Sequence, residues 1–555
     1  MSKQTQPQIT RISLNLRKKL NAPNFLFVYW AILIIYIQED AMEQFIQRHQ
    51  SYINHVLSGF DRLLFRGTLR SISHLKGMEV FLYANHVLLK DFGTFVLQRS
   101  NLIKEQSEQY ARQHHRPYQY LSSSSVSKEE IAREIMKRDN ITGGLICVLY
   151  CVEPCQSYAI HKDKDAKKLK LIPATRKCLH FYFYLVDREF GFMHVRLQSW
   201  FPCPIQICLN GREILARQMD KAGIRYQRRD NCFVDIADPQ KAQEMADALI
   251  KRNWTKLLDK FGERFNPLIR LNSGLNLRGY YWTIRQSEYA TDVVFKDSSI
   301  LAAIYPRLTR HAIENFSAED VMRFMGRRCD GRFPGEVVSD LKKRPEGVRI
   351  KHRVEDNSIK MYDKQCYVLR IETTINNPRR FKTYRPAIRK GQSTKAWIPM
   401  RKSVADIYRR VEICRAANNR YLDALAVIGN EEPSHQLFDS VSRPVYHNGC
   451  RYRPLRPISP EEAKHFQAVL NGKFFIHGFR NADLRKMLLP ETICEVEKCR
   501  AMGRMTRLIG LLRAHGLIRK VSKTRVYRVT EKGQCVMSTS LIFRDTDISL
   551  LTKAG

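Results

Sequence analysis

The sequence predicts an α+β protein whose body is built on an antiparallel sheet with helical insertions, followed by a separate C-terminal domain. Apolar and polar residues alternate through residues 144–198 and again through 357–376, which is typical of strands joined in hairpins. Segments with a helical spacing of apolar residues lie between these stretches. Residues 459–540 contain three helical segments and then a short, basic strand, turn and strand.

The charge of the chain is strongly unbalanced. Its 555 residues include 94 Lys and Arg against 55 Asp and Glu, and the net charge of +39 is spread along the chain. A solvated surface does not need this excess of cations, so we expect a polyanion partner, DNA first and RNA second. A membrane surface is the competing explanation. No motif for a small-molecule cofactor is evident.

The 14 cysteines are scattered without a paired framework. Cys147, Cys151 and Cys155 are equally spaced, and no second pair of the kind that zinc sites use follows them. Their apolar surroundings favour a buried strand. This use of cysteine indicates a reducing, cytoplasmic setting.

Residues 1–41 are expected to be an N-terminal extension outside the fold. The apolar run from Phe25 to Ile37 is shorter than the roughly 20 residues that a membrane-spanning helix needs. Acidic and polar residues follow it instead of a cleavage site. The extension is therefore either an anchor or a segment upstream of a start at Met42, and we expect no membrane contact unless it is an anchor.

The body is expected to span residues 42–428, and its first half begins with a helix. A strand with Asp61 between apolar neighbours follows in GFDRLLFRGTLR, and helical patterns fill roughly residues 74–112. Ser127 and Glu130 form a capping box after a serine-rich loop. Strands then follow in GLICVLYCVEP, HFYFYLVD and FGFMHVRLQSW.

The last two of these strands form a hairpin with one apolar and one polar face. The polar face carries His180, His194 and Arg196, together with Tyr182 and Tyr184. Histidines on a hairpin are structural, contact nucleic acid or bind a metal. The tyrosines either stack bases or pack in the core. We take His194 and Arg196 as candidate nucleic-acid-binding residues.

The second half of the body starts with an α/β unit in REILARQMDKAG, CFVDIAD and PQKAQEMADALIKRNWTKLLDKF. Strand character returns in YYWTIRQSEYATDVVF, where Glu288 and Asp292 are four residues apart and so share a face. A mostly helical insertion is expected at about 299–343. The helix SVADIYRRVEICRAANNRYLDAL closes the body, and residues 429–458, rich in Pro, Arg and Asn, are expected to be a linker.

The segment SIKMYDKQCYVLRIETTI predicts a hairpin whose register follows from its apolar residues. With Lys364–Cys366 as a three-residue loop, Met361 lies opposite Leu369 and Ile359 opposite Ile371, which places the apolar residues on one face. A two-residue loop would mix the faces. The other face gathers the polar side chains Ser358, Lys360, Tyr362, Arg370 and Glu372.

These residue types suit attack on a phosphodiester. A tyrosine phenolate can attack a DNA phosphate and hold the strand as a phosphotyrosyl ester. Because free tyrosine has a pKa of about 10, cations such as Lys360, Lys364 and Arg370 are needed to favour the anion. Glu372 can hold a divalent ion, by hypothesis Mg²⁺ or Mn²⁺, that polarises the phosphate. Tyr362, Lys364 and Arg370 are the candidate catalytic residues, and Lys360 is a candidate strand-binding residue.

The same segment resembles the tyrosine segment of rolling-circle replication initiators, the plasmid-initiator and filamentous-phage nicking classes. Those proteins have a strand ending in Tyr-Asp-Lys and then Arg-x-Glu on the next strand. The resemblance implies that Tyr362 is the nicking nucleophile and that Arg370 and Glu372 are the Arg-x-Glu pair. FDRLLFRGTLR resembles their first strand, which often carries an aspartate like Asp61. These stretches are a small part of the 555 residues.

The metal site departs from the family pattern. Many of these nickases hold their metal with a His-hydrophobic-His strand, and this chain contains no such triplet. Glu288, Asp292 and Glu372 form an all-carboxylate alternative, because carboxylate oxygens are the ligands that Mg²⁺ prefers.

Residues 459–540 resemble a winged-helix DNA-binding domain, with a capping box at Ser459 and Glu462, three helices and a basic two-stranded wing. In that family the third helix enters the major groove and the wing reaches the backbone or the minor groove. The resemblance implies nucleic-acid contacts from Arg500, Arg504, Arg507 and Arg513 on the helix and from Lys523 and Arg525 on the wing. Protein contacts are the alternative use of such a domain. Residues 541–555 are expected to be a tail.

Taken together, the sequence favours a metal-dependent DNA nicking or strand-transfer enzyme, a replication initiator or a mobile-element-associated nickase. The rival hypothesis is a non-enzymatic winged-helix regulator with a large sensor or RNA-binding body.

Overall fold

The computed structural model describes residues 43–163, 168–270, 274–275, 277, 279–327, 335–344, 347–389, 392–426, 434–474, 478–489, 495–522 and 524–546. The N-terminal apolar run, Lys523 and most of the expected tail lie outside these residues. The chain divides into two compact units. Unit 1 is Met1–Ile53, Ala302–Pro334 and Ala416–Gly555, and unit 2 is Asn54–Leu301 and Gly335–Arg415.

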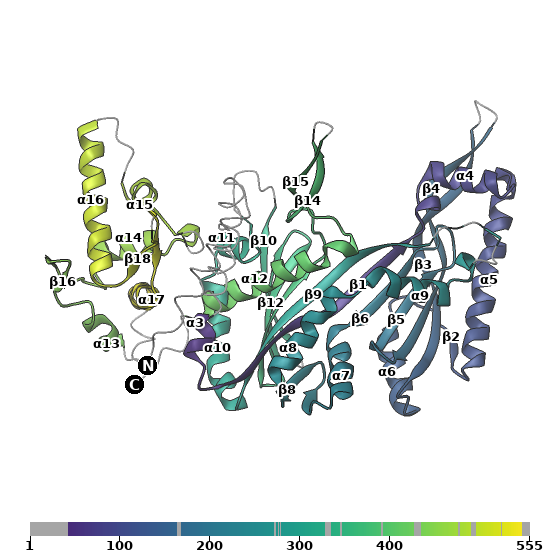
Figure 1. Ribbon diagram of the computed structural model, residues 1–555, viewed down its shortest axis with the longest axis horizontal. Helices are drawn as coiled ribbons and strands as arrows, with labels where there is room; N and C mark the ends of the chain where they lie inside the picture. The colour runs from purple at the N-terminus through teal and green to yellow at the C-terminus, as the bar shows by residue number, and fades with distance from the viewer. Residues whose placement is uncertain are drawn as a thin grey trace, which may run out of the picture. The chain divides into compact units, whose positions relative to one another are not determined.

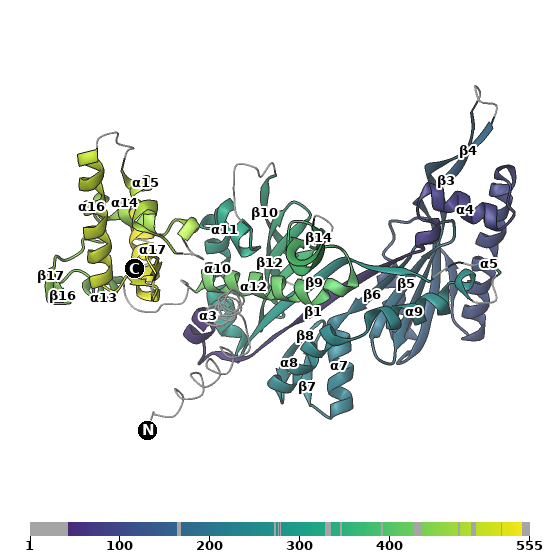
Figure 2. The ribbon, with the colours of Figure 1, turned by 45° about the horizontal axis from the view of Figure 1, so that its top comes forward.

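Unit 2 contains an eleven-stranded sheet in the order β10-β11-β12-β13-β9-β1-β6-β5-β4-β3-β2 (Figures 1 and 2). Its strands are β1 (Ile53–Thr68), β2 (Tyr118–Tyr120), β3 (Gly144–Asp163), β4 (Lys168–Asp187), β5 (Gly191–Gln198), β6 (Ile205–Asn210), β9 (Tyr281–Phe295), β10 (Val337–Arg344), β11 (Gly347–Val354), β12 (Asn357–Lys364) and β13 (Val368–Ile375). Where the register is defined, neighbours are antiparallel, except β2 with β3. The expected mixture of helices with a largely antiparallel sheet is confirmed.

Helices and short hairpins complete unit 2. They are α4 (Leu75–Ala84), α5 (Phe92–Gln113), α6 (Lys128–Arg138), α7 (Gly211–Ala222), α8 (Pro239–Ala248), α9 (Trp254–Phe265), β7 (Tyr226–Arg229) with β8 (Cys232–Ile236), and β14 (Lys382–Arg389) with β15 (Gln392–Pro399). Side chains cap several helix starts, and the Ser127 hydroxyl accepts from the Glu130 N–H as predicted. Helices α10 (Ser298–Glu314) and α12 (Ile407–Leu425) include residues of both units.

The predicted β4–β5 hairpin is present, with Phe183 opposite Val195 and Tyr184 opposite His194. The expected polar face is covered as well. Tyr182 and Tyr184 are buried in a cluster that α6 closes with Ala132 and Ile135. These tyrosines therefore pack in the core, which is the second of the two alternatives that the sequence left open.

The β12–β13 hairpin has the predicted three-residue loop, shifted by one position. Lys364 pairs with Val368 and Met361 with Ile371, so the loop is 365–367. The predicted pairing of Met361 with Leu369 is wrong. Both registers bury the same apolar face, because the observed pairing differs from the predicted one by two residues, and a shift of two residues preserves the alternation. The positive φ angles of Gln365 and Cys366 belong to the loop of the observed register.

The expected helical insertion is helical only in its first part. Helices α10 and α11 (Ala318–Phe324) are followed by β10, which pairs along its length with β11 at the edge of the sheet. The Ser317 side chain caps α11. Residues 337–342, VVSDLK, do not alternate apolar with polar residues, so the sequence pattern gave no clear strand signal there.

Unit 1 holds the C-terminal helices around one apolar core. The elements are α3 (Glu43–Arg48), α11, α13 (Ser434–Asp439), β16 (Val445–His447), β17 (Cys450–Tyr452), α14 (Pro460–Val469), α15 (Asn481–Leu488), α16 (Glu495–Ala514), β18 (Ile518–Lys520), β19 (Tyr527–Val529) and α17 (Glu531–Asp545). Ser459 caps α14 by accepting from the Glu462 N–H. Leu437, Val441 and Leu455 are buried in the core that α14, α16 and α17 share. The described part of the expected linker is thus packed with the C-terminal helices.

Phe479 forms an isolated antiparallel bridge with Tyr527 of β19. The chain order is therefore helix α14, the bridged residue, helices α15 and α16, and the β18–β19 hairpin. None of the helices in the described part of the chain is long and apolar enough to cross a membrane.

Candidate metal and tyrosine site

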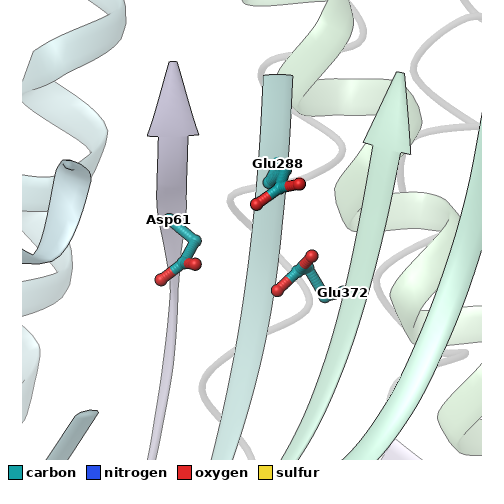
Figure 3. A group of neighbouring side chains, drawn as sticks. All are labelled: Asp61, Glu288 and Glu372. Atoms are coloured by element: carbon teal, nitrogen blue, oxygen red, sulfur yellow. The ribbon is translucent and has the colours of Figure 1, made fainter. Parts of the chain in front are cut away.

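Three carboxylates meet on three neighbouring strands of the large sheet. Asp61 lies on β1, Glu288 on β9 and Glu372 on β13, and one oxygen from each lies within 4.8 Å of the others (Figure 3). The strand register brings them together, because Thr374 pairs with Glu288. Glu372 precedes Thr374 by two residues on β13 and so lies on the same face. Hard oxygen donors at this spacing fit a divalent cation such as Mg²⁺, Mn²⁺ or Ca²⁺.

Lys360 and Tyr362 hold Glu372 from the adjacent strand β12. The Lys360 ammonium donates to Glu372 Oε1 at 2.6 Å and lies 3.6 Å from Glu288 Oε1. The Tyr362 hydroxyl donates to Glu372 Oε2 at 2.7 Å. The predicted tyrosine and its predicted carboxylate are therefore in direct contact. One lysine and one phenol leave the cluster with more negative than positive charge.

Arg370 joins the cluster to a buried ion pair. Its guanidinium donates to Asp61 Oδ1 at 3.1 Å and binds Asp292 through Nε at 2.5 Å and Nη2 at 2.8 Å. Arg212 of α7 lies 2.9 Å from the same Asp292 carboxylate. Two guanidinium groups thus engage Asp292, and Asp61 takes the place in the carboxylate cluster that the sequence assigned to Asp292. Asn231 completes the set by donating to Asp61 Oδ1 at 2.6 Å.

The electrostatics divide the three carboxylates. Burial raises the pKa of Asp61, and the positive charge of Arg370 opposes the rise only in part. Burial and the negative charge of Glu372 raise the pKa of Glu288. Burial also acts to raise the pKa of Glu372, but Lys360, Tyr362 and Arg370 hold it below its ordinary value. Glu372 is therefore the member that most favours ionisation, and a bound cation would favour the ionised form of the other two.

The Tyr362 phenol is protonated in this arrangement. Burial raises its pKa well above 10, and the charge of Glu372 adds to that rise. Arg370, whose guanidinium carbon lies 6.0 Å from the ring centre, acts in the opposite direction. Anything that offsets the carboxylate charge beside the phenol lowers its pKa.

An open cleft of 360 Å³ leads to the cluster along β1, β5 and β6. Asp61 and Glu288 line it, and so do Arg62 and Arg133, which both bind Glu129. Arg228, Asp230 and His194 also belong to the lining. Cationic side chains at the mouth of a carboxylate site suit a phosphate that approaches a bound metal.

The other body candidates have partners outside the carboxylate cluster. Lys364 lies 2.9 Å from Asp230, which is exposed, and Arg196 binds Glu153 at 2.5 Å and the Tyr182 hydroxyl at 2.9 Å. His194 lines the cleft, and burial lowers its pKa to about 4, so the imidazole is neutral. His180 is buried against its own strand, where its Nδ1 lies 3.3 Å from the Cys178 carbonyl, and pairs with Gln198 rather than with His194.

Three of the four arginines predicted on α16 share one stripe. Arg500, Arg504 and Arg507 are exposed at spacings of four and three residues, which place them along one side of a helix. Arg513 is half-buried and, at about 100° per residue, lies on the opposite side. Arg525 is exposed between β18 and β19, and Lys523 lies outside the described residues.

Sequence reasoning missed Arg212 and Asn231, which support the site from α7 and the β7–β8 turn. Arg212 stands beside Glu213 in an ordinary helical pattern, and Asn231 ends a run of polar residues in a turn, so no local signal marks either residue. Asp61 carried a signal, since it interrupts an apolar strand, but only the pairing of β1 beside β9 makes it a neighbour of Glu288.

Comparisons with known proteins give no match: no family model, no curated protein and no solved structure resembles this chain significantly.

Proposed function

We propose that this protein nicks DNA with a tyrosine nucleophile at a divalent-metal site, as rolling-circle replication initiators do. The single observation that carries the proposal is the contact between the Tyr362 hydroxyl and Glu372, inside a cluster of three carboxylates. A surface tyrosine has no need of such a cluster. The cluster also places more negative charge together than stability favours, which is typical of functional sites.

The chemistry uses groups that are already in contact. Tyr362 Oη forms a bond to phosphorus while one bridging phosphorus–oxygen bond of the strand breaks. The leaving oxygen takes a proton from water, and the resulting hydroxide receives the proton that Glu372 has taken from the phenol. The phenol proton passes to Glu372, whose Oε2 lies 2.7 Å from Oη. A divalent cation held by Asp61, Glu288 and Glu372 would polarise the phosphate and offset the charge beside the phenol. Arg370 keeps Asp61 in position.

The C-terminal helices supply a means of finding DNA. Two features support a winged helix: the order of three helices followed by the β18–β19 hairpin, and the bridge from Phe479, which follows α14, to Tyr527 of β19. The exposed stripe of Arg500, Arg504 and Arg507 lies on α16, the third helix of that arrangement. Such a stripe binds the phosphates or base edges of a groove. The net charge of +39 supports a polyanion partner in general.

The test is incubation of the full chain with supercoiled plasmid and with circular single-stranded DNA, each with Mg²⁺ or Mn²⁺. The wild type should convert part of the DNA to nicked or linear forms and leave a protein–DNA adduct that survives denaturing electrophoresis. Tyr362→Phe should abolish the adduct, because the ring remains and only the attacking oxygen is lost. Chelation of the metal should abolish it as well.

Tyr367→Phe is the matched control, since Tyr367 lies in the loop of the same hairpin and contacts Arg229 rather than a carboxylate. This variant should form the adduct normally. Cleavage that persists unchanged in Tyr362→Phe would refute the nucleophile assignment.

A non-enzymatic duplex-binding regulator is the alternative, and the arginine stripe of α16 is the observation that favours it. Sequence-specific duplex binding by the full chain, with no cleavage under any metal, would support the regulator and refute the nicking proposal.

A further inference from the structure

A second surface of unit 2 has the chemistry of a ligand site, the β14–β15 hairpin. Its two strands form a sheet of their own that stands clear of the large sheet (Figure 1). The base of the hairpin is fixed, because the Met400 N–H donates to the Phe381 carbonyl at 2.8 Å and Arg385 lies 3.3 Å from Asp406. The hairpin follows β13, the strand that carries Glu372, after a short connection.

One face of this hairpin is exposed along its described length. Directly opposite residues of an antiparallel pair share a face. The pairs on this face are Lys382 with Pro399, Tyr384 with Trp397 and Pro386 with Lys395, and all six residues are exposed. At its centre the rings of Tyr384 and Trp397 lie 5.5 Å apart and remain 48% and 49% exposed.

The surrounding sequence is purely cationic. From Thr373 to Ala405 there are nine Lys or Arg and no Asp or Glu. Arg409 extends the surface from α12, with its guanidinium carbon 5.2 Å from the Trp397 ring centre. Arg409 and Arg385 each have one carboxylate partner, Glu412 and Asp406, and the cations of the segment outnumber these acids. Flat aromatic faces within an excess of cations fit a ligand that offers both rings and negative charge.

We propose that the β14–β15 hairpin binds single-stranded DNA, with bases stacked on Tyr384 and Trp397 and phosphates paired with Lys382, Lys395 and Arg409. Base–aromatic stacking inside a cationic groove is the general mode of single-strand binding. A duplex keeps its base faces covered, so it cannot use the aromatic pair. The proposal rests on the exposure and charge of the hairpin and does not require the nicking activity.

The test is fluorescence anisotropy of labelled oligo(dT) with the full chain in EDTA, where no metal-dependent cleavage occurs. The double variant Tyr384→Ala/Trp397→Ala should bind at least about tenfold more weakly. The variant Lys382→Ala/Lys395→Ala should lower the slope of log affinity against log salt by about 1.4, since each single-strand phosphate contact contributes about 0.7. Tyr83→Ala, which removes an 86% exposed tyrosine from α4 of the same unit, is the control and should bind normally.

Intrinsic fluorescence gives a second measurement. Trp254 and Trp282 are buried, whereas Trp397 is half-exposed, so oligo(dT) should quench a component of the emission that Trp397→Phe removes.

Three results would overturn the proposal. Unchanged oligo(dT) affinity in the aromatic double variant would show that the hairpin is not the site. An equal loss for duplex DNA would show binding through phosphates alone, and tighter binding of oligo(rU) would assign the surface to RNA. A chain that never nicks DNA but binds oligo(dT) through the hairpin would refute the proposed function and leave this proposal standing.

Discussion

Replacing Glu288 by Gln separates a metal site from a cluster that merely stabilises the fold. The substitution keeps the shape and the hydrogen-bonding capacity of the side chain and removes one of three carboxylates that lie within 4.8 Å of one another. Glu288 is the suitable member, because the lysine that pairs with it, Lys360, lies nearer to Glu372.

The free energies follow from that geometry. At an effective dielectric constant of about 20, two carboxylates about 4.8 Å apart repel each other by roughly 3 kcal/mol when both are ionised. Lys360 offsets part of this, and the raised pKa of Glu288 relieves the rest by retaining a proton. The metal-free Glu288→Gln variant should therefore be at least as stable as the wild type.

Bound metal should make the wild type more stable than Glu288→Gln. A cation at about 100 times its dissociation constant stabilises the folded protein by about 2.7 kcal/mol, which raises the melting temperature of a large domain by about 2–4 °C. Glu288→Gln should lose most of that rise. The pKa of Glu288 is raised in the folded protein, so its proton stabilises the fold below the ordinary pKa, and that contribution is lost as pH rises through the folded-state pKa. Metal binding needs the deprotonated carboxylate, so the metal-induced rise in the melting temperature of the wild type should grow with pH.

The assay is thermal melting by circular dichroism in EDTA and in millimolar Mn²⁺ or Mg²⁺ at two pH values. Glu129→Gln is the control, since Glu129 lines the same cleft but pairs with Arg62 and Arg133 outside the cluster. Two results would refute the reasoning: a metal-free Glu288→Gln protein that melts well below the wild type, or a metal response that the variant retains.

Two further predictions concern the ion pair behind the site and the C-terminal helices. Arg370→Met should lower the free energy of unfolding by about 3–5 kcal/mol in urea, because it removes the guanidinium that binds Asp61 and leaves the buried Asp292 with Arg212 alone. Arg380→Met, at a half-exposed surface pair, should change it by less than about 1 kcal/mol. Equal losses would contradict the buried-pair argument. Arg504→Ala should weaken duplex binding and lower the slope of log affinity against log salt by about 0.9 per lost phosphate contact. Arg513→Ala, on the opposite side of α16, should have a smaller effect in the same titration. A larger effect of Arg513→Ala would place the DNA on the other side of the helix.

The β12–β13 hairpin marks how far a sequence pattern reaches. Alternation of apolar residues fixed which side chains share a face, so Lys360, Tyr362 and Glu372 were grouped correctly. The alternation did not fix the register, since a relative shift of two residues between the strands preserves it. The loop conformation, with positive φ at Gln365 and Cys366, made that choice.

Local sequence patterns predicted burial least well where another segment of the chain covers the residues. The face of β4 that carries Tyr182 and Tyr184 has a polar pattern, but α6 covers it. The whole of β3 separates α6 from β4 in the sequence. The expected linker contains too few apolar residues to predict a core, yet Leu437, Val441 and Leu455 are buried by the C-terminal helices. Burial depends on partners that a local window does not contain.

The amino-acid pattern was enough to predict the cationic character of the chain, the class of fold, and the group of Lys360, Tyr362, Arg370 and Glu372 on one hairpin face. Which carboxylates complete that group depends on how distant strands pair. Asp61 and Asp292 are equally plausible acids in the sequence, but the order of the strands places Asp61 beside Glu288 and Glu372, while Arg212 and Arg370 surround Asp292. Ion pairing between distant segments is a property of the fold, because a charge is matched by whichever opposite charge folding brings within a few ångströms.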